Sequence, residues 1–471
     1  MAAAGAAIVG AAATIDRDGV TAAAAVAAGR SARYRSRPDL VPPTTSVTDP
    51  GGASDDAQGY VFVTPNGPTI LDGRGEPVWI HPVPHASADL RVQTYRGEPV
   101  LTWWEGTVTK YGTGSGVGVV MDRRYRKLAT IRAGNGLWAD LHELTLTDRS
   151  TAYVTAVEQV EADLRTVGGP RRAPLLRSYV QEVDVATGEV LFEWNSADHI
   201  PLEETEQQYQ AGKPFSSVHL NSVDVMADGN LLVSARNTWT LYKIDAGDGR
   251  ILWRLGGKAS DFVLGPDVAF AWQHDARQQP DGSITLFDDE AGPAERPRSR
   301  GLVLSVDEAT MRVTLHKAYV HRRPPLLATS QGSMQVLDGG GAFVGWGSEP
   351  YYTQFAANGT EVLDGRFATG TSYRAFRYPW TGRPATRPSV ALERPVGRPA
   401  AVYASWNGAT DVTSWRVLGG PSSAAMTTVV EVGRQGFETV VPLLMAPAAV
   451  AVQALDRAGT VLGRSRTVVT A

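Results

Sequence analysis

One short phrase that recurs along the chain constrains its fold more than any other feature. In each copy an alternating strand leads into a polar turn, and a second strand follows that often ends in Trp. The copies follow one another at intervals of about 50 to 60 residues. Their anchors are Asp72, Asp122, Asp184, Asp245, Asp307 and Phe355. This spacing indicates one structural unit that is repeated six times.

A second predicted hairpin precedes most copies, with turns at Gly97, Arg149, Gly229, Gly282 and Gly340. Two hairpins per unit make a four-stranded antiparallel sheet, and six such sheets in a ring protect their edges by closure. A layered sandwich would also use many short strands, but it does not predict even spacing of one phrase. The sequence therefore predicts an all-β chain with a six-bladed β-propeller over residues 59–380, in which Trp79, Trp194 and Trp253 pack between blades.

The flanking segments have a different amino-acid composition. Residues 381–397 are rich in Pro and Arg, which suits a linker, and residues 398–471 predict a small β-sandwich. The phrases WNGATDVTSWRV and AVQALD in that segment resemble fibronectin type III and other Ig-like modules. Residues 1–58 are expected to be a tail and lead-in, and their apolar start MAAAGAAIVGAAAT is interpreted as the remnant of an export signal. An extracytoplasmic or secreted location is expected on that basis.

Composition excludes several classes of function. A formal net charge of −4 gives no general attraction to nucleic acid, and no transmembrane segment is expected because long apolar runs are absent. The chain has no cysteine, which rules out thiolate catalysis and cysteine-ligated metals.

Three of the eight histidines share a position relative to the predicted turns. His142, His219 and His274 each lie seven to ten residues before a hairpin turn, and Gln331 has the same place in the last unit. If the first strand of each blade runs beside the propeller axis, these side chains meet at one rim of the central channel.

Hairpin geometry adds further members to this group. Because antiparallel strands return to the end from which they started, Arg236 is expected near His219 and Asn221, and Asp289 near His274. An Arg beside the imidazoles would repel a metal dication, so no metal is expected, whereas Arg, Asn and His donors suit an oxyanion. A nucleophilic His among such donors would permit group transfer through a covalent intermediate. The rim aromatics Trp239, Trp272 and Trp346 are candidates to hold an aryl ring.

The chain resembles the bacterial arylsulfotransferase (arylsulfate sulfotransferase) family, in its actinobacterial and fungal branch, over roughly residues 34–380. The resemblance is carried by DLHELTLT, HLNSVDVMADGNLLVSARNTWTLYKID, GRILWRLGGK, FAWQHDARQQPDGSITLFDDEAG, QGSMQVLDGGGAFVGWGSEPYYTQF and SYRAFRYPW. It implies a six-bladed propeller that transfers a sulfuryl group from a phenolic sulfate ester to a phenolic acceptor, by a ping-pong reaction through a sulfohistidine. No nucleotide sulfate donor or other cofactor is implied.

Matched residue by residue, the resemblance makes His274 in WQHDA the nucleophile. It assigns binding of the sulfuryl group to His142, His219, Asn221 and Arg236. The family often has Asn where this chain has Asp289, and an acidic side chain beside a sulfate would oppose its binding.

Two other classes of protein remain open at this point. One is a non-catalytic extracellular propeller that binds a sulfated or otherwise anionic ligand at the same rim. The other is a quinone-dependent dehydrogenase propeller, which needs a calcium site and far more cofactor contacts. The sequence predicts no oligomeric state.

Overall fold

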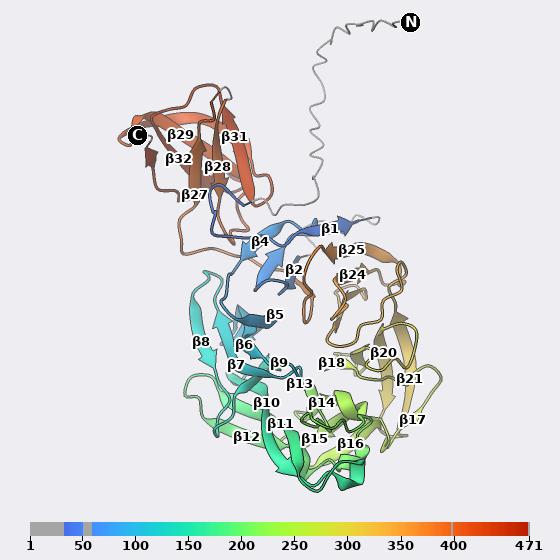
Figure 1. Cartoon of the computed structure of the whole chain (residues 1–471). Coiled ribbons are helices and arrows are strands. Elements are labelled where there is room, and N and C mark those ends of the chain that lie inside the picture. Colours follow the sequence, from blue (N-terminus) through green and yellow to red (C-terminus); the bar gives the residue numbers. More distant parts are fainter. Residues whose placement is uncertain (1–32, 50–58, 397–398, 470–471) are drawn as a thin grey trace, which may run out of the picture.

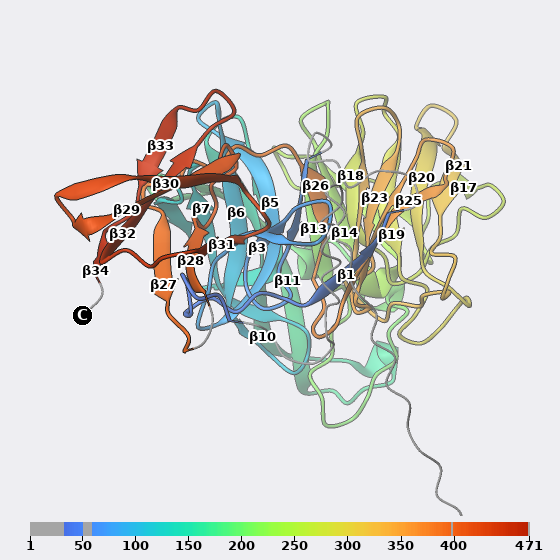
Figure 2. The same ribbon diagram turned by 90° about the horizontal axis from the view of Figure 1, so that it is seen from above.

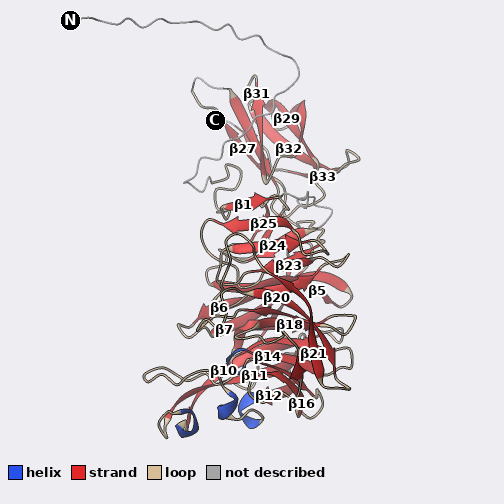
Figure 3. Ribbon diagram, turned by 90° about the vertical axis from the view of Figure 1, so that its right-hand side faces the viewer, coloured by secondary structure: helices blue, strands red, loops and turns tan. Residues whose placement is uncertain are grey.

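The computed structural model describes residues 33–49, 59–396 and 399–469. Strands dominate this part of the chain (Figure 3), which contains no α-helix. Its helical segments are single 3₁₀ turns: η2 (Arg165–Val167), η3 (Ser196–Asp198), η4 (Leu202–Glu204) and η5 (Arg236–Thr238). None of the described residues forms a helix with the length and apolarity needed to cross a membrane. The apolar stretch interpreted as an export remnant lies outside the described residues.

The sheets of residues 59–380 are arranged in a ring, as in a β-propeller (Figure 1). One sheet has the strand order β26-β2-β3-β4, so a strand from the end of this region completes the sheet that begins it. Its strands are β2 (Tyr60–Val63), β3 (Thr69–Leu71), β4 (Pro77–Ile80) and β26 (Phe376–Tyr378). This pairing closes the ring.

The next two groups of four strands are continuous in one eight-stranded sheet, because β7 touches β9 through the pair Gly116 and Ala139. The first group is β5 (Ala86–Tyr95), β6 (Glu98–Val108), β7 (Gly114–Met121) and β8 (Lys127–Ile131). The second group is β9 (Ala139–Leu146), β10 (Thr151–Ala162), β11 (Ala173–Asp184) and β12 (Val190–Asn195).

Three further sheets complete the ring. One is formed by β13 (Leu220–Val225), β14 (Leu231–Ala235), β15 (Thr240–Ile244) and β16 (Ile251–Gly256). The next holds β18 (His274–Gln278), β19 (Ile284–Asp288), β20 (Arg300–Asp307) and β21 (Arg312–Tyr319), with the short β17 (Val263–Leu264) parallel to β21. The last contains β22 (Ser333–Val336), β23 (Ala342–Gly345), β24 (Tyr351–Phe355) and β25 (Glu361–Phe367), and it is extended by β1 (Thr45–Thr48).

The first strands of these groups line the centre of the ring. They contact one another in the order β5, β9, β13, β18, β22, β26 and back to β5. Side chains at the start of these strands therefore face a shared space, although they are far apart in the sequence.

The recurring acidic turn has a simple physical basis. The carboxylate of Asp245 accepts hydrogen bonds from the backbone N–H groups of Gly247 and Asp248, at 2.9 and 3.1 Å. Asp side chains stabilise turns in this way because they replace a backbone acceptor. The other four aspartates do the same: Asp72, Asp122, Asp184 and Asp307. Each anchor, with Phe355 as the sixth, lies at the outer hairpin of its strand group.

The hydrophobic core lies between neighbouring sheets. Trp253 packs with Leu286 and Leu302 of the following sheet, and Trp194 packs with Val233 of the next one. Trp79 packs with Trp103 at a ring-centroid distance of 6.2 Å. These three tryptophans are buried, so their expected role in packing between sheets agrees with the structure.

The C-terminal residues form two sheets beside the ring (Figure 2). One contains β27 (Ser389–Glu393), β28 (Ala400–Ser405) and β31 (Glu438–Leu443). The other contains β29 (Ser414–Ser422), β30 (Ala425–Gly433), β32 (Ala449–Leu455), β33 (Val461–Arg464) and β34 (Val468–Val469). Both sheets contribute to one core, where Trp415 packs among aliphatic side chains.

Two expected boundaries differ from the structure. The segment 381–397, expected as a linker, contains β27, which pairs with β28 along its whole length. The segment expected as a tail and lead-in contains β1, and Ser36 in it donates to the carboxylate of Glu438 at 2.6 Å. The proline-rich composition of residues 381–397 did not predict the strand β27. Ser36 is held by Glu438, a partner about 400 residues away in the sequence.

Candidate functional site

A cavity of about 670 Å³ opens at one end of the ring, where the inner strands begin. Three imidazoles line it, from His142 in β9, His219 just before β13 and His274 at the start of β18. Arg236 and Gln331 also line it, as their distance from the hairpin turns predicts. The structure therefore brings together most of the side chains that the sequence places at this rim.

His274 is held in one orientation by two hydrogen bonds. Its Nε2 accepts the backbone N–H of Gln331 at 3.2 Å, and its Nδ1 lies 2.7 Å from Oδ2 of Asp289. Because a backbone N–H points at Nε2, that nitrogen must carry a lone pair, so the ring proton is on Nδ1. Burial, and then the Arg236 guanidinium, lower the pKa of His274 well below its usual value. The cavity is thus lined by a neutral imidazole whose Nε2 is unprotonated.

Asp289 contacts the far side of this imidazole and does not line the cavity. Burial raises the pKa of Asp289, and the Arg236 guanidinium opposes that shift. Asp289 would oppose a bound anion, as its sequence position led us to expect, only if its carboxylate faced the ligand. In the structure the His274 ring lies between the carboxylate and the cavity, so the carboxylate fixes the tautomer and can stabilise positive charge that develops on the ring.

His142 and His219 form a hydrogen-bonded pair. Their Nε2 atoms are 3.1 Å apart, and the rings meet edge to face. Nδ1 of His142 is hydrogen-bonded to Asp140, which also accepts the backbone N–H of Gly114. Burial lowers the pKa of His219, and His142 and Arg236 add to the shift. The arrangement Asp140, His142, His219 is a chain along which one proton can be held or passed.

Arg236 presents a fixed cation to the same cavity. It begins the 3₁₀ turn η5, directly after β14, and its backbone N–H donates to the carbonyl of His219 at 2.9 Å. The guanidinium stacks on the ring of Trp272 at 4.7 Å and donates to the Thr329 carbonyl at 3.1 Å. A planar donor group that is already oriented binds a tetrahedral oxyanion with little further loss of entropy.

Two groups of sequence candidates do not reach the cavity. Asn221 is fully buried below it and donates from Nδ2 to the Gln273 carbonyl at 2.6 Å, so it supports the backbone next to His274. The three tryptophans proposed for the aryl ring are not among the lining residues: Trp239, Trp272 and Trp346. The aromatic lining comes instead from Tyr111, Phe215 and Tyr373.

Tyr373 is a lining residue that the sequence argument missed. It precedes β26, the inner strand that closes the ring, just as Gln331 precedes β22. Its ring meets His142 and His274 edge to face, at centroid distances of 5.7 and 6.5 Å. The hydroxyl is buried and has no hydrogen-bond partner among the described residues, and burial raises its pKa well above the usual value. The position of Tyr373 just before an inner strand could have identified it, but only if residues 376–378 had first been recognised as the strand that closes the ring.

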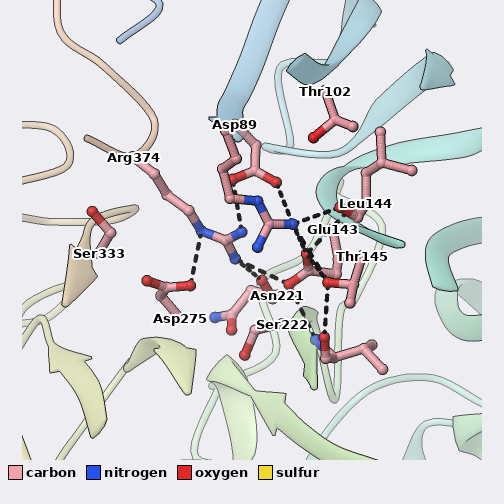
Figure 4. A network of polar contacts seen from close by, with 12 residues as sticks. Asp89, Thr102, Glu143, Leu144, Thr145, Asn221, Ser222, Asp275, Ser333 and Arg374 are labelled. Atoms are coloured by element: carbon pink, nitrogen blue, oxygen red, sulfur yellow. Dashed lines mark hydrogen bonds and ion pairs between the residues drawn. The ribbon is translucent and has the colours of Figure 1, made fainter. Parts of the chain in front are cut away.

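A buried group of paired charges occupies the ring centre (Figure 4). Arg374, next to Tyr373, lies 3.0 Å from Asp89, 3.4 Å from Asp275 and 3.5 Å from Glu143. Glu143 also pairs with Arg91 and Arg277, at 2.5 and 2.6 Å. Burial alone would raise the pKa of Glu143, but the arginines hold it far below its usual value. Arg374 also donates to the Asn221 carbonyl at 2.7 Å, so this group connects the inner strands β5, β9, β13 and β18 with the segment just before β26.

In the described part of the chain, no three or more His, Asp or Glu side chains are grouped so that they could hold a metal ion. The cavity lining contains the Arg236 guanidinium and two imidazoles, His219 and His274, whose pKa values are lowered by burial. Such a set suits an oxyanion held beside an unprotonated imidazole.

Comparisons with solved structures find matches of low similarity. A protein of unknown function from Bacteroides caccae is 14% identical with a TM-score of 0.43, and the match covers 68% of this chain and 98% of the other. Virginiamycin B lyase from Staphylococcus aureus is 9% identical with a TM-score of 0.34, over 76% and 96% of the two chains. No curated protein matches the sequence.

A comparison with protein families gives a clear result. The model of the arylsulfotransferase (ASST) family matches residues 91–368, which is more than half of the chain. The match includes the three histidines, Arg236 and Asp289, all of which lie within its limits. The chain belongs to the arylsulfotransferase family.

Proposed function

We propose that the protein is an aryl sulfotransferase that moves a sulfuryl group from a phenolic sulfate ester to a phenolic acceptor, through a sulfohistidine at His274. Family membership implies a sulfotransferase that acts on small aryl substrates. The observation that carries the finer proposal is the unprotonated Nε2 of His274, which lines a cavity together with Arg236 and His219.

In the first half-reaction, the ester displaces the Gln331 N–H from Nε2 of His274, and the freed lone pair attacks the sulfur. The N–S bond forms as the bond from sulfur to the aryl oxygen breaks, and the phenolate leaves with the bonding electrons. Arg236 donates to the non-bridging oxygens, whose charge it stabilises in the transition state, and His219 lies beside the transferred group. The imidazole becomes cationic as it is sulfated, and the Asp289 carboxylate on Nδ1 stabilises that charge.

In the second half-reaction, the acceptor phenol loses its proton to the imidazole pair His142 and His219, and its oxygen attacks the same sulfur. The N–S bond breaks, and Nε2 of His274 regains its lone pair. His142 keeps its orientation through Asp140, so the pair can act as a base for each acceptor. The proton returns to the phenolate or to solvent between turnovers.

A fold consistent with this proposal has six blades, one for each first strand in the closed series β5, β9, β13, β18, β22 and β26. The continuity between β7 and β9 is then a contact between two blades. We propose that the two C-terminal sheets form a sandwich of fibronectin type III type, which is supported by their shared core.

Intact-mass measurement tests the covalent intermediate. The protein is incubated with 4-nitrophenyl sulfate in the absence of an acceptor, and a gain of one sulfuryl group that maps to His274 is expected. Addition of phenol should remove the gain and yield phenyl sulfate. Tight binding of aryl sulfates with no adduct and no transfer, across several donors, would instead identify a binding protein.

Asp289→Asn is expected to slow sulfohistidine formation by about 10- to 100-fold, because a hydrogen bond to a charged group becomes one to a neutral amide. The lost negative charge should also lower the pKa of His274 further. Since transfer needs the neutral imidazole, the acid limb of the pH profile of kcat/KM lies below pH 6.5 in the parent and moves to still lower pH in the variant. Stopped-flow release of 4-nitrophenolate, or of its conjugate acid at low pH, measures both.

Asp281→Asn in the same hairpin is the matched control, because Asp281 is exposed at the turn. A faster reaction or a lower KM in Asp289→Asn would show that Asp289 opposes the anion, as its negative charge alone suggests.

Tyr373→Phe is expected to lower kcat/KM for aryl sulfates by about 10-fold, because Tyr373 lines the cavity and its protonated hydroxyl has no partner among the described residues until substrate presents an acceptor oxygen. Steady-state kinetics with 4-nitrophenyl sulfate measure the change. Tyr352→Phe removes another buried hydroxyl that has no partner in the described part of the chain and lies outside the cavity, and it should leave kcat/KM unchanged. Equal effects of the two variants would contradict a role of Tyr373 toward substrate.

A further inference from the structure

The cavity carries more positive charge than a single sulfate ester requires. Its lining includes the cations Arg236, Lys110 and Lys213, and none of its lining residues is Asp or Glu. Asp140 and Asp289, the nearest carboxylates that the chemistry uses, are bonded to imidazoles outside the lining. Arg236 suffices for the one negative charge of an aryl sulfate, so the two lysines need another explanation.

The two lysines come from separate loops at the cavity mouth. Both side chains are exposed, and neither has a carboxylate partner in the described residues. Lys213 donates to the amide oxygen of Gln210 at 2.9 Å, and the Lys110 ammonium lies 5.1 Å from the ring centroid of Tyr111. Neither contact neutralises the charge, and both leave ammonium hydrogens available for another acceptor.

Both loops are anchored close to the site. In the loop 109–113 between β6 and β7, the Thr109 N–H donates to Thr113 at 2.7 Å and the Gly112 N–H donates back to Thr109 at 3.1 Å. A Cβ on Gly112 would lie 4.0 Å from Cε1 of His219, so the tip of this loop lies over the imidazole pair.

The second loop, which carries Lys213, is anchored through Phe215 and Ser216. Phe215 makes two backbone hydrogen bonds to the edge of β11, at 2.7 and 2.8 Å. Asn237, the residue after Arg236, donates to the Ser216 carbonyl at 2.6 Å. The two lysines are therefore held at the mouth by loops that are already ordered, which reduces the entropy lost on binding.

We propose that Lys110 and Lys213 select aryl substrates that carry a second anionic group, such as a carboxylate, on the ring side away from the reacting oxygen. This inference rests on the proposed sulfuryl transfer and names its substrate class. The reacting oxygen lies between His274 and the imidazole pair, while Tyr111 and Phe215 contact the ring and the ammonium groups contact the distal anion. The preference is electrostatic and weakens as salt is added.

Acceptor kinetics test this selection with two phenols that differ in the charge of the para substituent. 4-Hydroxybenzoate carries the second anion and methyl 4-hydroxybenzoate does not; 4-nitrophenyl sulfate is the donor for both. We expect a lower KM for the carboxylate in the parent chain. In the Lys110→Gln, Lys213→Gln double variant, the advantage in KM of the carboxylate over the ester should fall by about 10-fold.

Lys127→Gln is the matched control, because Lys127 is an exposed lysine of β8 outside the cavity lining. It should leave the KM ratio at the parent value. Equal KM values for the two acceptors in the parent, or the same change in the ratio for the control and the double variant, would overturn the assignment.

Calorimetry separates this inference from the proposed function. Binding of 4-carboxyphenyl sulfate is compared with that of its methyl ester, in the parent and in the double variant. Charge-dependent binding that the double variant loses, without transfer to any acceptor, would support the lysine assignment and overturn the proposed transfer. Transfer whose substrate binding does not depend on the second charge would support the proposed function and overturn the lysine assignment.

Discussion

His274→Ala is expected to lower the rate of transfer from 4-nitrophenyl sulfate to phenol by about 1,000-fold or more, because it removes the nitrogen that is proposed to bond to sulfur. The His274→Ala variant should also form no sulfuryl adduct. Residual activity should come from Arg236, which can still orient the ester.

The matched control for this variant is His316→Ala, which removes an exposed imidazole of β21. Its transfer rate should equal that of the parent. Calorimetric binding of phenyl sulfate should persist in His274→Ala, which shows that the cavity is intact. Full transfer activity in that variant would remove His274 from the reaction and with it the covalent mechanism.

Arg374→Met is expected to destabilise the propeller region by about 3–5 kcal/mol, because it leaves buried carboxylates without a counter-charge. Arg374 is fully buried and pairs with Asp89, Asp275 and Glu143. It also donates to the Asn221 carbonyl, so its loss removes a connection between inner strands. The midpoint of urea unfolding, followed by tryptophan fluorescence, measures the change.

Arg171→Met, at an exposed position, controls for loss of one positive charge and should shift the midpoint little. If a variant with Met at 374 does not fold, Arg374→Lys keeps a charge in the cluster but lacks the guanidinium fork that several partners share. We expect it to fold with an intermediate midpoint. A midpoint equal to that of the parent in either variant would show that the cluster contributes little to stability.

Much of the site could be predicted because the fold repeats. A residue seven to ten positions before each hairpin turn reaches the same rim, so His142, His219, His274 and Gln331 could be placed together from their spacing alone. Arg236 followed from the return of the antiparallel strand. The same count brought Asp289 to His274, where the structure shows them hydrogen-bonded.

The spacing of residues relative to the hairpin turns could not predict the direction of each side chain. Asn221 lies on the right strand but donates to a carbonyl below the cavity, and the candidate tryptophans pack elsewhere. Tyr373 was missed because its strand closes the ring by pairing with β2, more than 300 residues earlier. The linker prediction was misplaced for a similar reason, because β27 becomes a strand only through its partner β28.

The sequence by itself determined the repeat, the acidic turns and the convergence of imidazoles at one rim, because these depend on local hydrogen bonds and on a fixed spacing along the chain. The tertiary structure alone decided which nitrogen of His274 keeps a lone pair, which side of the ring Asp289 contacts and which aromatic side chains line the cavity. Those properties depend on contacts between strands that are distant in sequence, where a change of a few ångströms turns a ligand-binding group into a buried support.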